Sequence, residues 1–249
     1  MRLQDRVAVI TGAGRGIGRA IALAFAREGA DLVVNYRVDA ASAERTAGDI
    51  RTLGRRALVH RADVTRRDEV RTLLSAAAGE FGRIDVLVNN AGVNEVGVFS
   101  EITDEAWDRI MTVNLKGPFI CCQEAFPYLE RSGSGRIVNI ASVAGQYHGP
   151  KTVHYAVSKA GLISLTRVLA RYGAPANILV NAVAPGIIET DLTRDELRSA
   201  GGRAVVEMTL LKRPGQLDDV TAACVFLAST EQSYVTGQVL SVAGGAYLG

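Results

Sequence analysis

The sequence predicts an α/β protein of the doubly wound class, in which helices cover both faces of one parallel sheet. Short runs rich in valine, isoleucine and leucine recur along the chain, with amphipathic helical patterns between them. A glycine cluster stands between the first such run and the first helical pattern, as at the opening of a βαβ unit. The chain has 249 residues, 48% of them apolar, which is enough to bury the core of one domain spanning residues 1–249.

Seven segments have the length and apolar character of strands. The helical patterns between them require parallel crossover connections, and the right-handed crossover rule then gives the doubly wound topology. Ligands of such sheets bind beyond the carboxyl ends of the strands, where the glycine-rich and polar motifs of this chain fall. The predicted strands, in chain order, are Val7–Ile10, Asp31–Tyr36, Ala57–Arg61, Ile84–Val88, Arg136–Ile140, Ile178–Val183 and Gln238–Val242.

A glycine-rich loop over residues 11–18 follows the first predicted strand. Gly12, Gly16 and Gly18 let the backbone approach a pyrophosphate, whose charge is favoured by the N–H groups at the start of the next helix. The strict G-x-G-x-x-G spacing is not met, because Ile17 stands at its last position. Alone, such a loop is as well explained by an ordinary turn. Its place between the first strand and the first helix indicates nucleotide binding.

Tyr155 and Lys159 are four residues apart, so they share one face of a helix. A free tyrosine has a pKa of ~10 and transfers protons poorly at neutral pH, and a neighbouring ammonium lowers that pKa. Ser142, upstream of this pair, can orient a carbonyl group against the phenol. Alone, a Tyr-x-x-x-Lys pair is usually a solvated surface pair. With Ser142, the three side chains can protonate a ketone oxygen during hydride transfer.

Together these motifs resemble those of the short-chain dehydrogenase/reductase family, over essentially the whole chain. The resemblance implies a single Rossmann-type domain with a seven-stranded parallel sheet, a nicotinamide cofactor, and catalysis by Asn114, Ser142, Tyr155 and Lys159. Asn114 would help to hold a water relay that resupplies protons. Further matching segments are Asn89-Asn90-Ala91-Gly92, Val113-Asn114-Leu115-Lys116-Gly117, Pro185-Gly186 and Ile188-Glu189-Thr190.

The family mechanism gives the matching residues their expected roles. Tyr155 would donate the proton, Lys159 would lower the pKa of Tyr155 and bind the nicotinamide ribose, and Ser142 would position the carbonyl group. Asp63 and Val64 resemble the family's adenine clamp, although Asp63 can also be a turn or N-cap residue. The expected cofactor-binding residues are Gly12, Arg15, Gly16, Ile17, Gly18, Arg37, Asp63, Val64, Asn90, Ala91, Gly92, Tyr155, Lys159, Pro185, Gly186, Ile188 and Thr190.

The residues after the second predicted strand favour NADPH over NADH. An NAD site needs a carboxylate there to accept from the ribose 2′-hydroxyl, but Tyr36 occupies the position at which the family carries that acid. Arg15 and Arg37 instead supply guanidinium groups, which suit a 2′-phosphate. Asp39 is the alternative acid, although it falls at a predicted helix start.

Composition excludes several functional classes. A net charge of +2 gives no attraction to nucleic acid or to anionic membranes. Cys121, Cys122 and Cys224 are odd in number and lack metal-site spacing, which predicts reduced thiols and no metal site. Residues 1–6 lead directly into the first predicted strand, without room for a signal peptide, and no apolar run approaches the ~20 residues of a membrane span. We therefore expect a cytoplasmic protein.

The substrate is predicted from the resemblance. Residues 180–190 are closest to the pattern of 3-oxoacyl-(acyl-carrier-protein) reductases and related discrete ketoreductases of fatty acid or polyketide biosynthesis. This implies a 3-oxoacyl thioester, with an acyl carrier protein as partner and Arg131 and Arg171 as the nearest candidates to dock it. Residues 190–212 are expected to form a helical lid, and residues 146–148 to rim the pocket. Another small carbonyl or alcohol (a sugar, diketone or alicyclic ketone) and a non-catalytic NADP-binding regulator remain alternatives.

A homotetramer is also expected. The predicted helices Trp107–Arg131 and His154–Tyr172 carry apolar residues on more faces than one sheet contact can bury. Family members pair these helices across a two-fold axis, and a second axis joins the last strand to its neighbours. Ordinary intrachain packing is the alternative. The residues concerned are Ile110, Val113, Phe119, Phe126, Val157, Leu162, Leu165 and Leu169.

Overall fold

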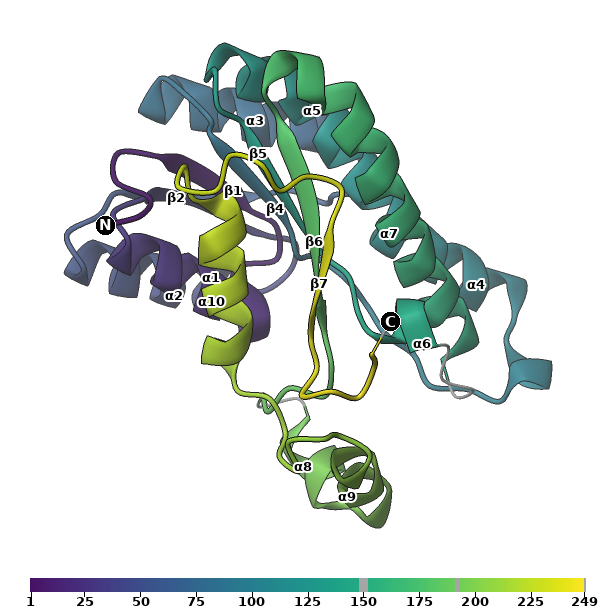
Figure 1. Cartoon of the computed structure of the whole chain (residues 1–249). Helices are drawn as coiled ribbons and strands as arrows, with labels where there is room; N and C mark the ends of the chain where they lie inside the picture. The colour runs from purple at the N-terminus through teal and green to yellow at the C-terminus, as the bar shows by residue number, and fades with distance from the viewer. Residues whose placement is uncertain (148–151, 191–192, 249) are drawn as a thin grey trace.

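The computed structural model describes residues 1–147, 152–190 and 193–248. In these residues, seven parallel strands form one sheet in the order β3-β2-β1-β4-β5-β6-β7 (Figure 1). The order reverses between β1 and β4, which confirms the doubly wound, Rossmann-type topology. The strands are β1 (Val7–Ile10), β2 (Asp31–Tyr36), β3 (Ala57–Arg61), β4 (Val86–Asn89), β5 (Arg136–Ile140), β6 (Leu179–Pro185) and β7 (Val239–Val242).

The predicted bounds of β1, β2, β3 and β5 are confirmed, and those of the other strands shift by one or two residues. β4 extends through Asn89, because this residue pairs in register with Asn139 of β5 and its amide donates to Asn139 Oδ1 at 2.8 Å. β6 extends to Pro185, which pairs with Val242 of β7. These two extensions carry the sheet further toward the glycine loop.

Successive side chains along each strand point to opposite faces of the sheet. Ile10 packs into one core with α1 (Gly16–Arg27), α2 (Ala40–Thr52) and α10 (Leu217–Ala228). Val9, its neighbour, points to the other core, which is built with α3 (Arg67–Phe81), α5 (Gly117–Arg131) and α7 (Val153–Gly173). Figure 1 shows these two groups of helices on opposite sides of the sheet.

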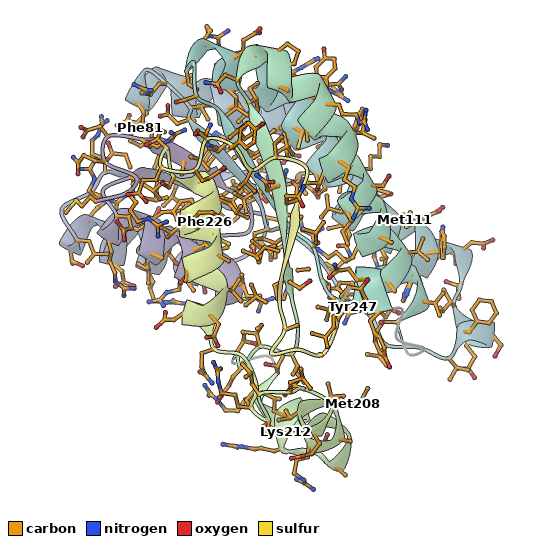
Figure 2. All side chains as sticks on the ribbon, viewed as in Figure 1. Phe81, Met111, Met208, Lys212, Phe226 and Tyr247 are labelled. Atoms are coloured by element: carbon orange, nitrogen blue, oxygen red, sulfur yellow. The ribbon has the colours of Figure 1, made fainter. Side chains whose placement is uncertain are left out.

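Shorter helices complete the described chain. α4 (Asp104–Met111) and α6 (Ala144–Tyr147) pack against α7, and a π-helical turn, Thr112–Lys116, joins α4 to α5. α8 (Arg194–Arg198) and α9 (Ala200–Glu207) stand off from the sheet, and Met208 and Lys212 follow them on the same segment (Figure 2). Two 3₁₀ turns lie at Phe99–Glu101 and Ala174–Ala176. No helix within the described ranges is long and apolar enough to span a membrane.

Two arginines are buried at the amino end of the sheet, away from the glycine loop. Arg136 is 3% exposed and Arg6 is 5% exposed. Arg6 donates to the carbonyl oxygens of Asp85 and Ser134. Arg136 joins the start of β5 to the end of α10 and the loop that follows. Its guanidinium donates to the carbonyl oxygens of Ser134, Gly135, Ser229 and Gln232 at 3.0–3.3 Å.

We expect Arg136→Met to lower the free energy of unfolding by about 2–4 kcal/mol, because it leaves buried carbonyl groups without donors. Urea denaturation measures the effect. The control is Arg131→Met, which removes an exposed arginine at the end of α5 and should change stability by less than about 0.5 kcal/mol. Equal unfolding midpoints for the two variants would contradict this role of Arg136.

Candidate functional site

A cavity of about 700 Å³ opens at the carboxyl edge of the sheet. It runs from the glycine loop past the ends of the central strands to the residues after β6. All the predicted site residues except Asn114 line it: Gly12, Arg15, Gly16, Ile17, Gly18, Arg37, Asp63, Val64, Asn90, Ala91, Gly92, Ser142, Tyr155, Lys159, Pro185, Gly186, Ile188 and Thr190. The fold therefore gathers motifs that span most of the sequence into one continuous site.

The glycine loop has the geometry of an anion cradle. Arg15, the N-cap of α1, has an extended backbone and makes no side-chain capping bond, so the first N–H groups of the helix face the cavity uncapped. Gly16 has a φ of +56°, and a Cβ built there would meet nothing within 4 Å. A Cβ on Gly18 would lie 2.4 Å from both Gly12 O and Asn90 Nδ2. The loop thus fits the pyrophosphate of a dinucleotide, and only glycine fits at position 18.

Two polar side chains that the sequence analysis did not single out hold this loop in place. Asn35 Oδ1 accepts from the Gly12 N–H at 3.2 Å, and its amide donates to Ala62 O at 3.0 Å. The Thr11 hydroxyl accepts from the N–H groups of Asn90 and Ala91, each at 3.0 Å. An asparagine inside the apolar strand β2 is a signal that could have revealed the first of these contacts.

Ser142, Tyr155 and Lys159 meet at the centre of the cavity. Ser142 and Tyr155 line the cavity together, and Ser142 Oγ accepts from the Ala144 N–H at 3.1 Å. Lys159 lies one turn along α7 from Tyr155, with Nζ 5.7 Å from the centroid of the phenol ring. Nζ donates to Ile140 O at 2.7 Å, at the end of β5. The structure brings these three side chains into one cavity, while their catalytic roles stay a prediction.

The pKa shifts of this pair differ from the expectation. Burial raises the pKa of Tyr155, although the hydrogen bond from Ser142 opposes that rise. Burial also lowers the pKa of Lys159 to about 8. The prediction that Lys159 leaves Tyr155 with a depressed pKa is wrong for this structure. The physical reason is desolvation, which disfavours the charged form of each group and is the largest cause of both shifts.

Asn114 lies behind the cavity wall, in the π-helical turn between α4 and α5. Its Oδ1 accepts from the Val93 N–H at 2.8 Å. Its amide donates to Val93 O at 2.8 Å and to Ser158 Oγ at 3.1 Å. A Cβ on Gly92 would lie 3.3 Å from Asn114 Oδ1 and 3.6 Å from Lys159 Nζ. Asn114 therefore ties the loop after β4 to α7, while the water relay expected of it stays a prediction.

The segment after β6 forms the far end of the cavity. The Thr193 hydroxyl donates to Ile188 O at 2.6 Å, accepts from the Thr190 N–H at 2.9 Å, and lies 3.0 Å from the Thr190 hydroxyl. Ile188 also forms a parallel bridge with Gly215, so the chain leaves and rejoins the body at adjacent points. Thr193 lines the cavity but was missed from the sequence, because its role depends on contacts and on no motif that we recognised.

The adenosine end of the cavity lies where β2 and β3 finish. Tyr36, Arg37 and Asp63 line it, and Arg37 Nη1 lies 3.6 Å from Asp63 Oδ2. Asp39 caps the start of α2, as predicted, and accepts from the Ser42 N–H at 2.9 Å and from Ser42 Oγ at 2.5 Å. Both carboxylate oxygens of Asp39 are thus engaged within α2. Asp63 is a turn residue as well as a lining residue, because its Oδ1 accepts from Thr65.

The structure describes two of the three residues that were predicted to rim the substrate pocket. Gln146 and Tyr147 lie in α6, where Gln146 Oε1 accepts from Ser241 Oγ at 2.9 Å and Tyr147 is exposed. His148 lies outside the described residues. The expected helices within residues 190–212 are present as α8 and α9. Their action as a lid stays a prediction.

The low pKa of Lys159 predicts a pH-dependent stability. The unfolded chain holds this proton up to pH ~10.5, whereas the folded protein releases it near pH 8, so between these values stability rises with pH. Relative to Lys159→Met, the free energy of unfolding of the wild type should rise by at most ~1.4 kcal/mol per pH unit across that window. Urea denaturation from pH 7.5 to 10 measures this, with Lys116→Met at an exposed position as the baseline. A wild-type advantage that falls with pH would contradict the assignment.

Comparison with known proteins gives the chain its family. A family profile described as Enoyl-(Acyl carrier protein) reductase matches residues 12–247. The chain is 39% identical over 247 residues to the 3-oxoacyl-(acyl-carrier-protein) reductase FabG of Staphylococcus epidermidis, covering 98% of this chain and 100% of the relative. It is 40% identical over 257 residues to the FabG of Thermotoga maritima, covering 98% and 99%.

A solved structure agrees with these relatives. The short-chain dehydrogenase of Burkholderia cenocepacia in complex with NADP superposes with a TM-score of 0.93 at 35% identity, covering 99% of each chain. An uncharacterized oxidoreductase of Methylorubrum extorquens is 40% identical over 246 residues, covering 98% of each. With the resemblance of its motifs, these matches show that the chain belongs to the short-chain dehydrogenase/reductase family of NAD(P)-dependent oxidoreductases.

Proposed function

We propose that this protein reduces a ketone to a secondary alcohol with NADPH, and that its substrate is a 3-oxoacyl thioester. The observation that carries the proposal is the convergence of Ser142, Tyr155 and Lys159 in the cavity that the glycine loop closes at its other end. The raised pKa of Tyr155 keeps its phenol protonated at neutral pH, as a general acid for carbonyl reduction requires.

The remaining residues act around this acid. When bound, the nicotinamide supplies the hydride. Ser142 and Tyr155 both hydrogen-bond the carbonyl oxygen, and the proton passes from Tyr155 Oη to that oxygen as it becomes an alkoxide. Lys159 lends positive charge to the phenolate that is left, and its pKa of about 8 leaves it mostly protonated at neutral pH. Asn114 holds the Gly92 loop against Lys159.

NADPH is favoured by the charges at the adenosine end. Tyr36 stands at the end of β2, where an NAD site would carry a carboxylate. The nearby carboxylate of Asp39 is already hydrogen-bonded to Ser42. Arg15 and Arg37 line the same region, and guanidinium groups bind phosphate well. A relative of the same fold has been solved with NADP. The two cations at the adenosine end therefore support NADPH as the working cofactor.

The 3-oxoacyl thioester rests on the FabG relatives, which match at nearly full length. If the thioester is carried on an acyl carrier protein, that acidic partner would dock near Arg131 and Arg171 at the ends of α5 and α7. Another small carbonyl compound is the second candidate, since a relative named only as an oxidoreductase is equally similar. Initial rates with an acetoacetyl thioester and with a panel of free ketones, each with NADPH and NADH, separate the two.

Tyr155→Phe should lower kcat at least about 100-fold with the preferred substrate, because general acid catalysis contributes ~10²–10⁴-fold. NADPH affinity, measured by fluorescence titration, should stay within about twofold. Tyr234→Phe, which alters an exposed tyrosine after α10, is the control. Retention of more than about a tenth of the wild-type rate by Tyr155→Phe would show that another group is the acid.

We also propose that the protein assembles as a homotetramer. Phe119 of α5 and Val157, Val168 and Tyr172 of α7 are exposed apolar side chains on the two helices expected at the interface. Two of the apolar residues named on these helices do not lie at such a surface. Ile110 and Leu162 are fully buried within the chain and belong to the intrachain packing.

Val168→Glu should therefore reduce the molar mass in solution, because it puts a charge into an apolar contact between helices. Light scattering at micromolar concentration measures the mass. Leu53→Glu, which places the same charge on an exposed leucine after α2, is the control and should leave the mass unchanged. A wild type that is already a monomer with full activity would refute the tetramer.

A further inference from the structure

The contact between Arg37 and Asp63 joins two residues that the sequence analysis treated separately. Arg37 follows β2 and Asp63 follows β3, and both line the adenosine end of the cavity. Arg37 Nη1 lies 3.6 Å from Asp63 Oδ2. The side chain of Arg37 is 60% exposed and that of Asp63 only 22% exposed. The carboxylate is thus the more buried partner of an exposed arginine.

Asp63 is held on its other side by its own loop. Its Oδ1 accepts from the Thr65 N–H at 2.9 Å and from the Thr65 hydroxyl at 2.8 Å. Its N–H donates to Glu69 Oε2 at 2.8 Å. These bonds leave Oδ2 directed at Arg37. Burial opposes the charge of Asp63, but the bonds from Thr65 and the nearby Arg37 outweigh it and lower the pKa of the carboxyl group.

We propose that Asp63 is a positioning residue for Arg37, and that it sets the preference of the site for a 2′-phosphorylated ribose. The inference rests on the proposed use of NADPH. A guanidinium has five N–H donors, so one contact to Oδ2 leaves the others for a phosphate. Holding an exposed arginine in place before the ligand arrives reduces the conformational entropy lost on binding.

The opposite effect is also physically possible, which makes the inference testable. A carboxylate repels a phosphate, and an ion pair partly neutralises the guanidinium that the phosphate needs. If repulsion dominated, Asp63 would weaken binding of a 2′-phosphate. Positioning should dominate because Asp63 is anchored by Thr65, whereas solvent screens the charges of a partly exposed pair.

The test compares two ligands that differ only in the 2′-phosphate: adenosine 2′,5′-bisphosphate and adenosine 5′-monophosphate. Their dissociation constants, measured by calorimetry, give a ratio from which any contact of Asp63 to adenine cancels. We expect Asp63→Asn to reduce the preference for the bisphosphate about fivefold. Thr65→Val, which removes one anchor of Asp63, should reduce it less, and Arg37→Met should abolish most of it.

Asp68→Asn is the matched control. Asp68 forms an ion pair with Arg66 at the same distance of 3.6 Å, close by in the chain, but it does not line the cavity. It should leave the preference unchanged, and thermal unfolding of each variant reports whether it is folded. An unchanged or increased preference in Asp63→Asn would overturn the inference. Equal wild-type affinities for the two ligands would overturn the NADPH proposal as well, which distinguishes the two failures.

Discussion

The whole site depends on the close approach of two loops where the strand order reverses, between β1 and β4. The Thr11 hydroxyl bonds the backbone of the loop after β4, and the Asn90 amide donates back to Thr11 O and Gly12 O at 2.9 and 3.0 Å. This approach is possible only because position 18 lacks a Cβ. The same contact places the start of α1 and the Gly92 loop on either side of one cleft. Binding of a dinucleotide and positioning of Lys159 thus share one local packing arrangement.

The electrostatics of the centre follow from burial. Tyr155 and Lys159 belong to the same helix and face the same cavity, and removal from water moves their pKa values in opposite directions. The free protein therefore holds a neutral phenol beside a mostly protonated amine at neutral pH. This is the protonation state that carbonyl reduction needs at its start. The sequence pattern suggested a phenol whose pKa is lowered by the ammonium, whereas the structure presents a neutral phenol with a mostly protonated amine one turn away.

Much of the architecture could be predicted because it depends on local patterns. Local sequence alone is enough to recognise the apolar runs of β1, β2 and β3 and the glycine loop. The bond of Lys159 to Ile140 O, the pairing of Arg37 with Asp63 and the position of Thr193 could not be predicted in this way. Each joins side chains or backbone groups whose separation is set by the packing of different elements. The depressed Tyr155 pKa was wrong for the same reason, since the cost of burial is a property of the folded environment.

The bridge between Ile188 and Gly215 has an evolutionary consequence. The chain leaves the body after Ile188 and returns beside it at Gly215. The segment that contains α8 and α9 therefore has its two ends held together. Its length and sequence can change at a modest cost in loop-closure entropy, without shifting Ser142, Tyr155 or Lys159. The residues of this segment can thereby diverge while these three side chains keep their positions. On the predicted role of this segment as a lid, a single scaffold can change the substrates it accepts through one segment, independently of its chemistry.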